Sequence, residues 1–151
     1  MIKAGIIGGA GYTAGELIRI LVNHPEVKIE FINSTSNAGK AVADVHGGLT
    51  GETELVFTNE LPLSDLDVLF LCSAHGDSRK FLEANAVPSG VRIIDLSTDY
   101  RQARPDHDFV YGLPEINREN VQKAVHVVNQ GCFATAIQMA ILLLAGDGLF
   151  T

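Results

Sequence analysis

Several residue types that mark specialised proteins are scarce in this chain. Its 151 residues include two cysteines, five prolines and no tryptophan. Cys72 and Cys132 lie 60 positions apart, so they form neither a disulfide framework nor the closely spaced ligand pairs of a zinc site. The histidines show no metal-ligand spacing either, and no metal is expected. Isolated thiols persist in a reducing compartment, which predicts a cytoplasmic location.

Positive charge and long apolar segments are also scarce. The chain has 11 Lys and Arg residues and 18 Asp and Glu residues, for a net charge of −7. Because there is no basic run, neither nucleic acid nor an anionic membrane is expected as a partner. The longest apolar run, 134–145, is interrupted by Thr135 and Gln138 and is too short to span a bilayer. The first residues enter a strand pattern directly, so no signal peptide is expected.

Apolar residues and glycine are plentiful. Hydrophobic residues make up 46% of the chain and glycine numbers 15, which suits one globular domain over 1–151. Strands are predicted over 2–7, 27–32, 54–58, 67–72, 92–96 and 125–128, and helices over 13–22, 75–85, 117–123 and 132–144. The segments 33–53 and 99–114 are predicted to be irregular, with a turn of helix near 39–45. Strands alternating with helices predict an α/β fold, a Rossmann-like, doubly wound and mainly parallel sheet with helices on both faces.

A run of small residues lies between the first strand and the first helix. Gly8, Gly11 and Ala14 have the spacing G-x-x-G-x-x-A, a relative of the dinucleotide-binding fingerprint. Small residues permit a tight turn and let the backbone approach a pyrophosphate, to which the helix N-terminus offers unpaired N–H groups. The pattern predicts a dinucleotide site, although glycines that simply make a tight turn have the same spacing.

The loop after the second strand bears on which dinucleotide is bound. A site for NAD usually has an acidic residue there, which binds the ribose 2′-hydroxyl. This chain has NSTSNAGK from Asn33 to Lys40, with no acid between Glu30 and Asp44. Hydroxyl groups and a lysine accept a 2′-phosphate, which a carboxylate would repel, so NADP (NADPH) is predicted. A solvated polar loop is the alternative.

Cys132 follows Gly131 and begins the last predicted helix, at the carboxyl end of a predicted parallel strand. A helix N-terminus favours the thiolate and so makes a thiol more nucleophilic. The backbone N–H groups of the first turn are suited to hold a substrate oxyanion. A buried packing cysteine is an equally good interpretation from position alone. For Cys72, at the end of the apolar run VLFLC, packing is the prediction.

Five motifs together resemble one family. IGGAGYTAGEL, SAHG, DLSTDYR, YGLPEINRE and NQGCFATA, in this order along the chain, resemble the N-acyl-γ-glutamyl-phosphate reductases of arginine biosynthesis. The aspartate-semialdehyde dehydrogenases share the general plan, but DLSTDYR separates this chain from them. The resemblance implies NADPH-dependent reduction of an N-acyl-γ-glutamyl phosphate to the N-acyl-glutamate semialdehyde, with release of phosphate, through a cysteine thioester.

The resemblance also implies roles for particular residues. Cys132 takes the place of the catalytic nucleophile. The residues assigned to the cofactor are Gly8, Gly9, Ala10, Gly11, Tyr12 and Thr13 in the glycine turn, Ser34, Thr35 and Ser36 in the 2′-phosphate loop, and Ser73, Ala74, His75 and Gly76 after the fourth strand. His75 is interpreted as a cofactor-side or helix-start residue rather than a base. Asp99 and Arg101 are expected to pair and so order their loop.

The chain departs from the family pattern in the cysteine motif and in length. Gln130 stands where the family motif usually has proline, which removes no reacting atom, and Phe133, Ala134 and Thr135 stand where Tyr-Pro-Thr is common. Members of the family also continue into a second domain with a histidine acid/base and a dimer surface, so the full-length protein is expected to be a homo-oligomer and this chain alone to be inactive. Two alternatives stay open: a stand-alone nucleotide-binding or regulatory module without catalysis, and another semialdehyde dehydrogenase of the same plan.

Overall fold

One parallel sheet organises the molecule. The structure is a computed structural model that describes residues 1–146 and 148–149. Within these residues seven strands pair in the order β3-β2-β1-β4-β5-β7-β6, all parallel. The strands are β1 (Ile2–Ile7), β2 (Val27–Asn33), β3 (Phe57–Thr58), β4 (Val68–Leu71), β5 (Arg92–Asp95), β6 (Val110–Tyr111) and β7 (His126–Val128). The strand order reverses direction between β1 and β4, which is where doubly wound folds bind ligands.

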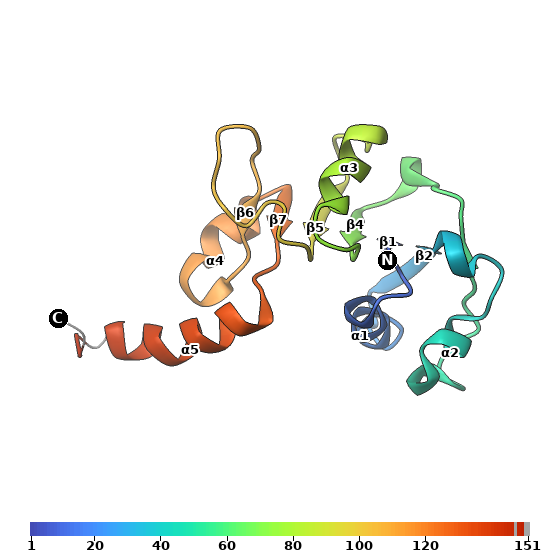
Figure 1. Ribbon diagram of the computed structural model, residues 1–151, viewed down its shortest axis with the longest axis horizontal. Helices are drawn as coiled ribbons and strands as arrows, with labels where there is room; N and C mark the ends of the chain where they lie inside the picture. The colour runs from blue at the N-terminus through green and yellow to red at the C-terminus, as the bar shows by residue number, and fades with distance from the viewer. Residues whose placement is uncertain (147, 150–151) are drawn as a thin grey trace.

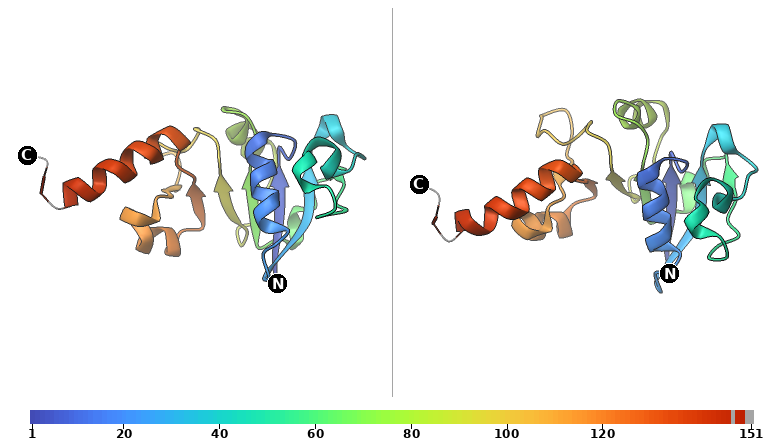
Figure 2. Two further views of the ribbon diagram at one scale, coloured as in Figure 1. Left: turned by 90° about the horizontal axis from the view of Figure 1, so that it is seen from below. Right: turned by 60° about the horizontal axis from the view of Figure 1, so that its bottom comes forward.

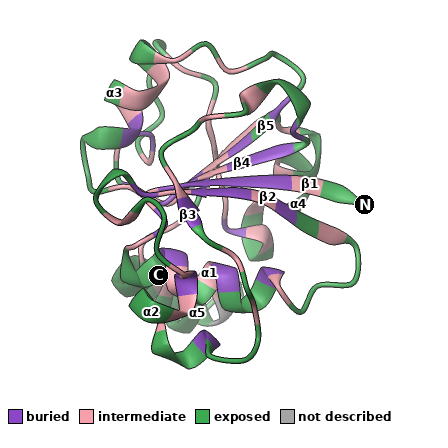
Figure 3. Ribbon diagram, turned by 90° about the vertical axis from the view of Figure 1, so that its right-hand side faces the viewer, coloured by how far each residue is buried: buried purple, intermediate pink, exposed green. Residues whose placement is uncertain are grey.

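Helices lie on both faces of this sheet. They are α1 (Tyr12–Leu21), α2 (Val42–Val45), α3 (Asp77–Ala84), α4 (Pro114–Lys123) and α5 (Cys132–Gly146), with short 3₁₀ turns η1 (Thr35–Asn37), η2 (Gly47–Leu49) and η3 (Leu63–Asp65). α1 and α3 lie on opposite faces of the sheet (Figures 1 and 3). The predicted doubly wound fold is therefore confirmed.

The hydrophobic core is divided by the sheet into two clusters. α1 buries Ala14 and Ile18 completely, four residues apart on one helix face. Successive side chains of β4 point to opposite faces, so Val68 joins the cluster beneath α1 while Leu69 and Leu71 join the cluster on the α3 side. Burying a branched side chain such as Ile18 contributes about 1.5–3 kcal/mol to stability.

The predicted elements differ from the structure mainly between residues 99 and 123. β6 lies in the segment predicted to be irregular, where only two residues pair with β7. α4 begins at Pro114, three residues before the predicted start of this helix at Asn117. Asn117 has non-helical angles inside α4 (φ −137°, ψ 24°), and its Oδ1 accepts a hydrogen bond from Asn120 Nδ2 at 2.6 Å. These angles mark a kink in α4 at Asn117.

Candidate cofactor and active site

The polar loops lie at the carboxyl ends of the strands, along one edge of the sheet. The last residues of five strands form a continuous row, since Asn33 pairs with Ile7, Ile7 with Leu71, Leu71 with Asp95, and Asp95 with Val128. The glycine turn, the NSTSNAGK loop, SAHG, the start of the DLSTDYR loop and the Cys132 loop all follow this row. Open parallel sheets bind their ligands at this edge.

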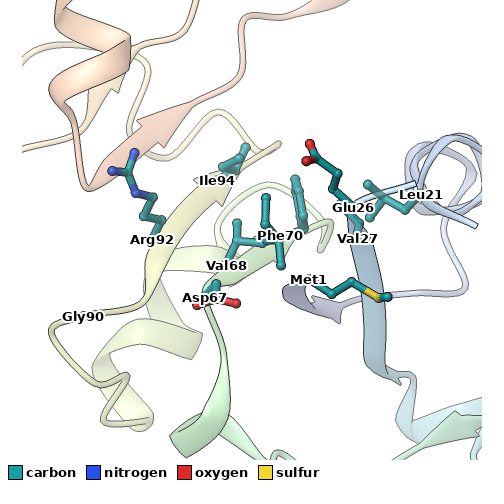
Figure 4. Close-up of a pocket in the computed structure, with 11 residues that line it drawn as sticks. Met1, Leu21, Glu26, Val27, Asp67, Val68, Phe70, Gly90, Arg92 and Ile94 are labelled. Carbon is teal, nitrogen blue, oxygen red and sulfur yellow. The ribbon is translucent and has the colours of Figure 1, made fainter. Parts of the chain in front are cut away.

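An open groove of about 630 Å³ lies elsewhere. Figure 4 shows that Met1, Val27, Val68 and Arg92 line it, and these residues precede or begin strands β1, β2, β4 and β5. It therefore opens at the amino ends of the strands, opposite the polar loops. Its lining is mainly apolar and carries none of the predicted site residues.

The glycine turn has no room for side chains on its inner side. Gly8 has φ +74°, and a Cβ there would lie 2.8 Å from the backbone nitrogen of Ser73. A Cβ on Gly9 would overlap the side chain of Ile32. The turn is closed by a hydrogen bond of 3.2 Å from the Gly11 N–H to the Gly8 carbonyl. Gly8 is thus required by close backbone approach, as the dinucleotide pattern needs, and Gly9 by the packing of Ile32. A Cβ on Gly11, in contrast, would make only an ordinary contact, 3.6 Å from the Gly8 carbonyl oxygen.

The N-terminus of α1 is open to an anion. Gly11 is the N-cap, without a side-chain cap, and the first turn of α1 contains no acidic residue. The Gly15 N–H donates to the Gly11 carbonyl at 3.0 Å, so the N–H groups of residues 12–14 precede the first intrahelical bond. Gly11, Tyr12 and Thr13 are exposed. A helix end of this kind binds phosphate groups, so these residues fit a dinucleotide.

The loop after β2 forms a small polar cluster beside the glycine turn. Asn37 Nδ2 donates to Ser34 Oγ at 3.3 Å and to Ser36 Oγ at 3.2 Å. Lys40 Nζ donates to Asn37 Oδ1 at 3.1 Å. Ser34 is buried, whereas Thr35 and Ser36 are exposed. The cluster offers hydroxyls and one ammonium group to a ligand.

The SAHG segment links β4 to α3. Gly76 has φ +87°, and its N–H donates to Asp99 Oδ1 at 2.6 Å. His75 is exposed, and its Nδ1 accepts a hydrogen bond from the Thr98 N–H at 3.2 Å. α3 begins directly after Gly76. His75 therefore lies at the start of a helix, with one ring nitrogen occupied by the backbone.

A buried network stands behind this segment. Asp95 is fully buried, and its carboxylate accepts hydrogen bonds from Ser78 Oγ (2.6 Å), Ser97 Oγ (2.8 Å) and the Ser97 N–H (3.0 Å). Burial, and secondarily the charge of Asp95, raise the pKa of the Cys72 thiol to about 12. Cys72 is thus a protonated packing residue at neutral pH, as its sequence position predicts.

The predicted pairing of Asp99 with Arg101 is wrong. Asp99 accepts hydrogen bonds from backbone N–H groups at the start of α3, from Gly76 and from Arg79 (3.0 Å). Arg101 instead donates from Nε to the Asn129 carbonyl at 3.1 Å and from Nη2 to the Leu96 carbonyl at 3.2 Å. Backbone groups of other segments, from Gly76 and Arg79 to Asn129, satisfy most of the bonding capacity of both side chains, so charge pairing within the loop is not needed.

These bonds give the DLSTDYR motif a role that its sequence did not reveal. Asp99 fixes the SAHG turn, and Arg101 fixes the loop that leads to Cys132. A Cβ on Gly131 would lie 2.6 Å from Arg101 Nη1, so the guanidinium lies directly beside the cysteine loop. No local pattern signalled these roles, because Gly76 and Asn129 lie 23 and 28 residues from Asp99 and Arg101.

Cys132 is exposed and is the first residue of α5. The Gly131 carbonyl accepts hydrogen bonds from the Thr135 N–H at 2.9 Å and from Thr135 Oγ1 at 2.8 Å, so the first-turn N–H groups of α5 have no intrahelical acceptor. β7 lies three strands from β1 in the sheet, a separation of about 14 Å at the usual strand spacing. Thiol and glycine turn therefore lie at the same edge of the sheet.

Comparison with known proteins shows the family. The family described as "Semialdehyde dehydrogenase, NAD binding domain" matches residues 3–124, most of the chain. The chain belongs to this family. The matched segment includes the glycine turn and ends before Cys132.

Curated relatives carry a more specific name. N-acetyl-gamma-glutamyl-phosphate reductase from Bacteroides fragilis is 67% identical over 145 residues, which is 96% of this chain and 45% of the relative. The protein of the same name from Bacteroides thetaiotaomicron is 63% identical over 151 residues, 100% of this chain and 47% of its own length. The predicted resemblance is thus confirmed. The chain spans about half the length of the curated relatives it matches.

Solved structures support the fold. Aspartate semialdehyde dehydrogenase from Candida albicans, determined with NADP, has a TM-score of 0.71 at 23% identity, covering 97% of this chain and 47% of that one. The enzyme from Francisella tularensis has a TM-score of 0.73 at 18% identity, covering 98% of this chain and 42% of that one. Among the described residues, no helix has the length and apolar character needed to cross a membrane.

Proposed function

We propose that this chain is the cofactor-binding half, with the cysteine nucleophile, of an NADPH-dependent N-acyl-γ-glutamyl-phosphate reductase. The observation that carries the proposal is the common sheet edge that the glycine turn shares with an exposed cysteine at a helix start. The names of the relatives support the oxidoreductase class and the acyl-phosphate substrate. The free cysteines support a reducing compartment and hence the cytoplasm. Assembly into a homo-oligomer stays a prediction.

The cofactor would be held in two places along this edge. The glycine turn and the first N–H groups of α1 would bind the pyrophosphate, because no side chain and no acidic group obstruct them. The Ser34–Ser36 loop and Lys40 would bind the 2′-phosphate. Glu30, the nearest acid before this loop, forms an ion pair of 2.9 Å with Lys28. This electrostatic setting favours NADP over NAD.

Cys132 would carry the covalent step. Its thiolate attacks the carbonyl carbon of the acyl phosphate, the carbon–oxygen bond to the phosphate breaks, and inorganic phosphate leaves with the electron pair. When bound, the reduced nicotinamide supplies a hydride to the resulting thioester carbonyl. The carbon–sulfur bond then breaks, so the aldehyde is released, Cys132 is again a thiolate, and one proton is taken up overall by the phosphate. Covalent catalysis replaces one difficult displacement by two easier ones.

The chain's own groups assist that step by position and charge. The first-turn N–H groups of α5 would hold the oxyanion formed when the sulfur attacks. Arg101, anchored to the Leu96 and Asn129 carbonyls, keeps the cysteine loop attached to β5 and adds a positive charge near the anionic substrate. Cys132 is thereby presented from a loop fixed at its base.

The proposal is tested by cofactor titration and by turnover. We expect NADPH to quench protein fluorescence or to show a heat of binding with a Kd at least tenfold below that of NADH. With NADP, N-acetyl-glutamate semialdehyde and phosphate, the 151-residue chain is expected to show little or no turnover. Failure to bind either dinucleotide would contradict the proposal, and equal affinities would contradict the NADP preference.

A further inference from the structure

We propose that His46 is a positioning residue of the glycine turn, which holds the Gly9 peptide in the orientation that a bound dinucleotide requires. This inference rests on the proposed cofactor site. His46 Nε2 lies 2.7 Å from the Gly9 carbonyl oxygen, although the two residues are 37 positions apart in the sequence. Because a carbonyl oxygen only accepts, Nε2 must carry the proton and donate it.

The segment that carries His46 is firmly attached to the core. His46 connects α2 to η2, and its N–H donates to the Val42 carbonyl at 2.9 Å while its own carbonyl accepts from the Leu49 N–H at 2.8 Å. Val42 is fully buried and Leu49 is 2% exposed. The imidazole is thus presented from a short segment fixed on both sides of it, which keeps the ring in place before any ligand arrives.

The ring also explains a glycine inside α1. Gly15 is helical, and glycine is unfavourable in a helix interior. A Cβ at Gly15 would lie 2.6 Å from His46 Nδ1 and 2.9 Å from its Cε1. The imidazole also lies at a tilt to the Phe57 ring, with ring centroids 6.2 Å apart. The helix thus leaves space for a ring that reaches over it to the glycine turn.

His46 completes the fixation of Gly9. Two peptide groups flank Gly9. The N–H of the first donates to the Asn33 carbonyl at 2.8 Å, and the carbonyl of the second accepts the hydrogen bond from His46 Nε2. In a trans peptide the next N–H, that of Ala10, points away from the carbonyl that His46 holds. Among the described residues, this N–H donates no hydrogen bond. It is therefore kept free and oriented for an anionic ligand.

Three substitutions separate positioning from packing. His46→Phe keeps a ring against Gly15 and Phe57 but has no donor. His46→Gln places an amide N–H near the position of Nε2, whereas His46→Asn places it near Nδ1, too short to reach Gly9. Loss of one hydrogen bond that orders the turn is expected to raise the NADPH Kd about tenfold in His46→Phe and His46→Asn, with His46→Gln within about threefold of the wild-type chain.

The second readout uses a ligand without a pyrophosphate. Adenosine 2′-monophosphate is expected to bind all four proteins with Kd values within about twofold, because it needs the Ser34–Ser36 loop and not the glycine turn. Equal weakening of NADPH and adenosine 2′-monophosphate would show a packing role and overturn the inference. If His46→Phe does not fold, the Gln and Asn variants decide, and equal NADPH affinities for these two would overturn it.

The same titrations separate this inference from the proposed function. A wild-type chain that binds no dinucleotide would remove the proposed cofactor site, and the role of His46 with it. A wild-type chain that binds NADPH, together with a His46→Phe variant that binds it equally well, would overturn the role of His46 and leave the cofactor site standing.

Discussion

The two ends of the sheet edge are built very differently. The glycine turn lies within a closely packed region, and Gly9 itself is buried. On the cysteine side, Leu113 and Val128 are the buried hydrophobic residues after Tyr100 in the described part of the chain. Figure 2 shows α5 running away from the strands that carry the cofactor turn. The cofactor side is thus preformed by its own contacts, whereas Cys132 is fixed mainly at the base of its loop.

α5 makes this contrast sharpest. Its side chains are apolar almost all round, and Phe133 is 77% exposed, with Ile137, Ile141 and Leu144 between 44% and 45%. A helix that is apolar on all sides is normally buried in a folded protein. Among the described residues, the hydrogen bond from Arg101 to the Asn129 carbonyl fixes the loop that precedes this exposed helix.

Thiol reactivity provides the largest expected difference. Because the pKa of Cys72 is raised to about 12, about one Cys72 in 10⁴ is a thiolate at pH 8. We expect iodoacetamide to modify the exposed Cys132 at least about 10³ times faster than Cys72, as measured by peptide mass spectrometry, with the difference lost in denaturant.

Exposure alone would also make Cys132 react faster than the buried Cys72. The alkylation rate of Cys132 must therefore be compared with that of a fully exposed reference thiol. A nucleophile activated by its helix should exceed glutathione in alkylation rate at pH 6.5, with the Cys72→Ala chain used to follow Cys132 alone. A rate at or below that of glutathione would favour a nucleotide-binding module without catalysis.

Glycine substitutions compare the packing of the two sides directly. Gly9→Ala forces a methyl group into Ile32 and is expected to lower the free energy of unfolding by about 2–3 kcal/mol. In Gly131→Ala the added methyl group meets only the end of the flexible Arg101 side chain. The free energy of unfolding is therefore expected to fall by less than about 1 kcal/mol. Urea denaturation measures the free energy of unfolding of both variants. Equal losses would contradict the difference in packing between the cofactor side and the cysteine side.

A charge placed in the polar loop tests the cofactor side. Ser36 is exposed beside Asn37 and Lys40, so Ser36→Glu places a carboxylate where the 2′-phosphate is proposed to bind. We expect the NADPH Kd to rise about tenfold while the NADH Kd changes less than about twofold. Ser36→Gln is the uncharged control, and an equal loss in both variants would point to shape rather than charge.

The smallest expected effect concerns the buried thiol of the packed region. Burial raises the folded pKa of Cys72 from 9.0 to about 12, so its stabilising contribution is complete below pH 9 and is lost as pH rises towards 12. At pH 9.5 the free energy of unfolding should have fallen by about 0.8 kcal/mol from this group. The Cys72→Ala variant should not show this loss of stability. Identical profiles of unfolding free energy against pH for the variant and the wild-type chain would contradict the raised pKa of Cys72.

Much of the cofactor side was predictable because its signals are local. β1 and the glycine turn coincide with their predictions, and α1 differs by one residue at each end. A buried strand, small residues and an amphipathic helix follow one another within about 20 positions, so periodicity identifies them. Cys132 at the start of a helix was predictable for the same reason.

The connections between the loops were not predictable in this way. Asp99 bonds to Gly76 and Arg101 to Asn129, over separations of 23 and 28 residues, and a local pattern cannot identify such partners. The two-residue strand β6 is likewise defined by pairing with β7, and its apolar run of three residues, Phe109 to Tyr111, is too short for periodicity to identify a strand.

The sequence by itself determined the alternation of strands and helices apart from β6, the glycine turn and the place of Cys132, since each depends on residues that are neighbours in the chain. The tertiary structure alone decided that His46 lies over Gly15, that Arg101 anchors the cysteine loop, and that one sheet edge collects these groups. Such contacts depend on strand register and on close packing between distant segments, which backbone hydrogen bonds and buried side chains establish only after the chain has folded.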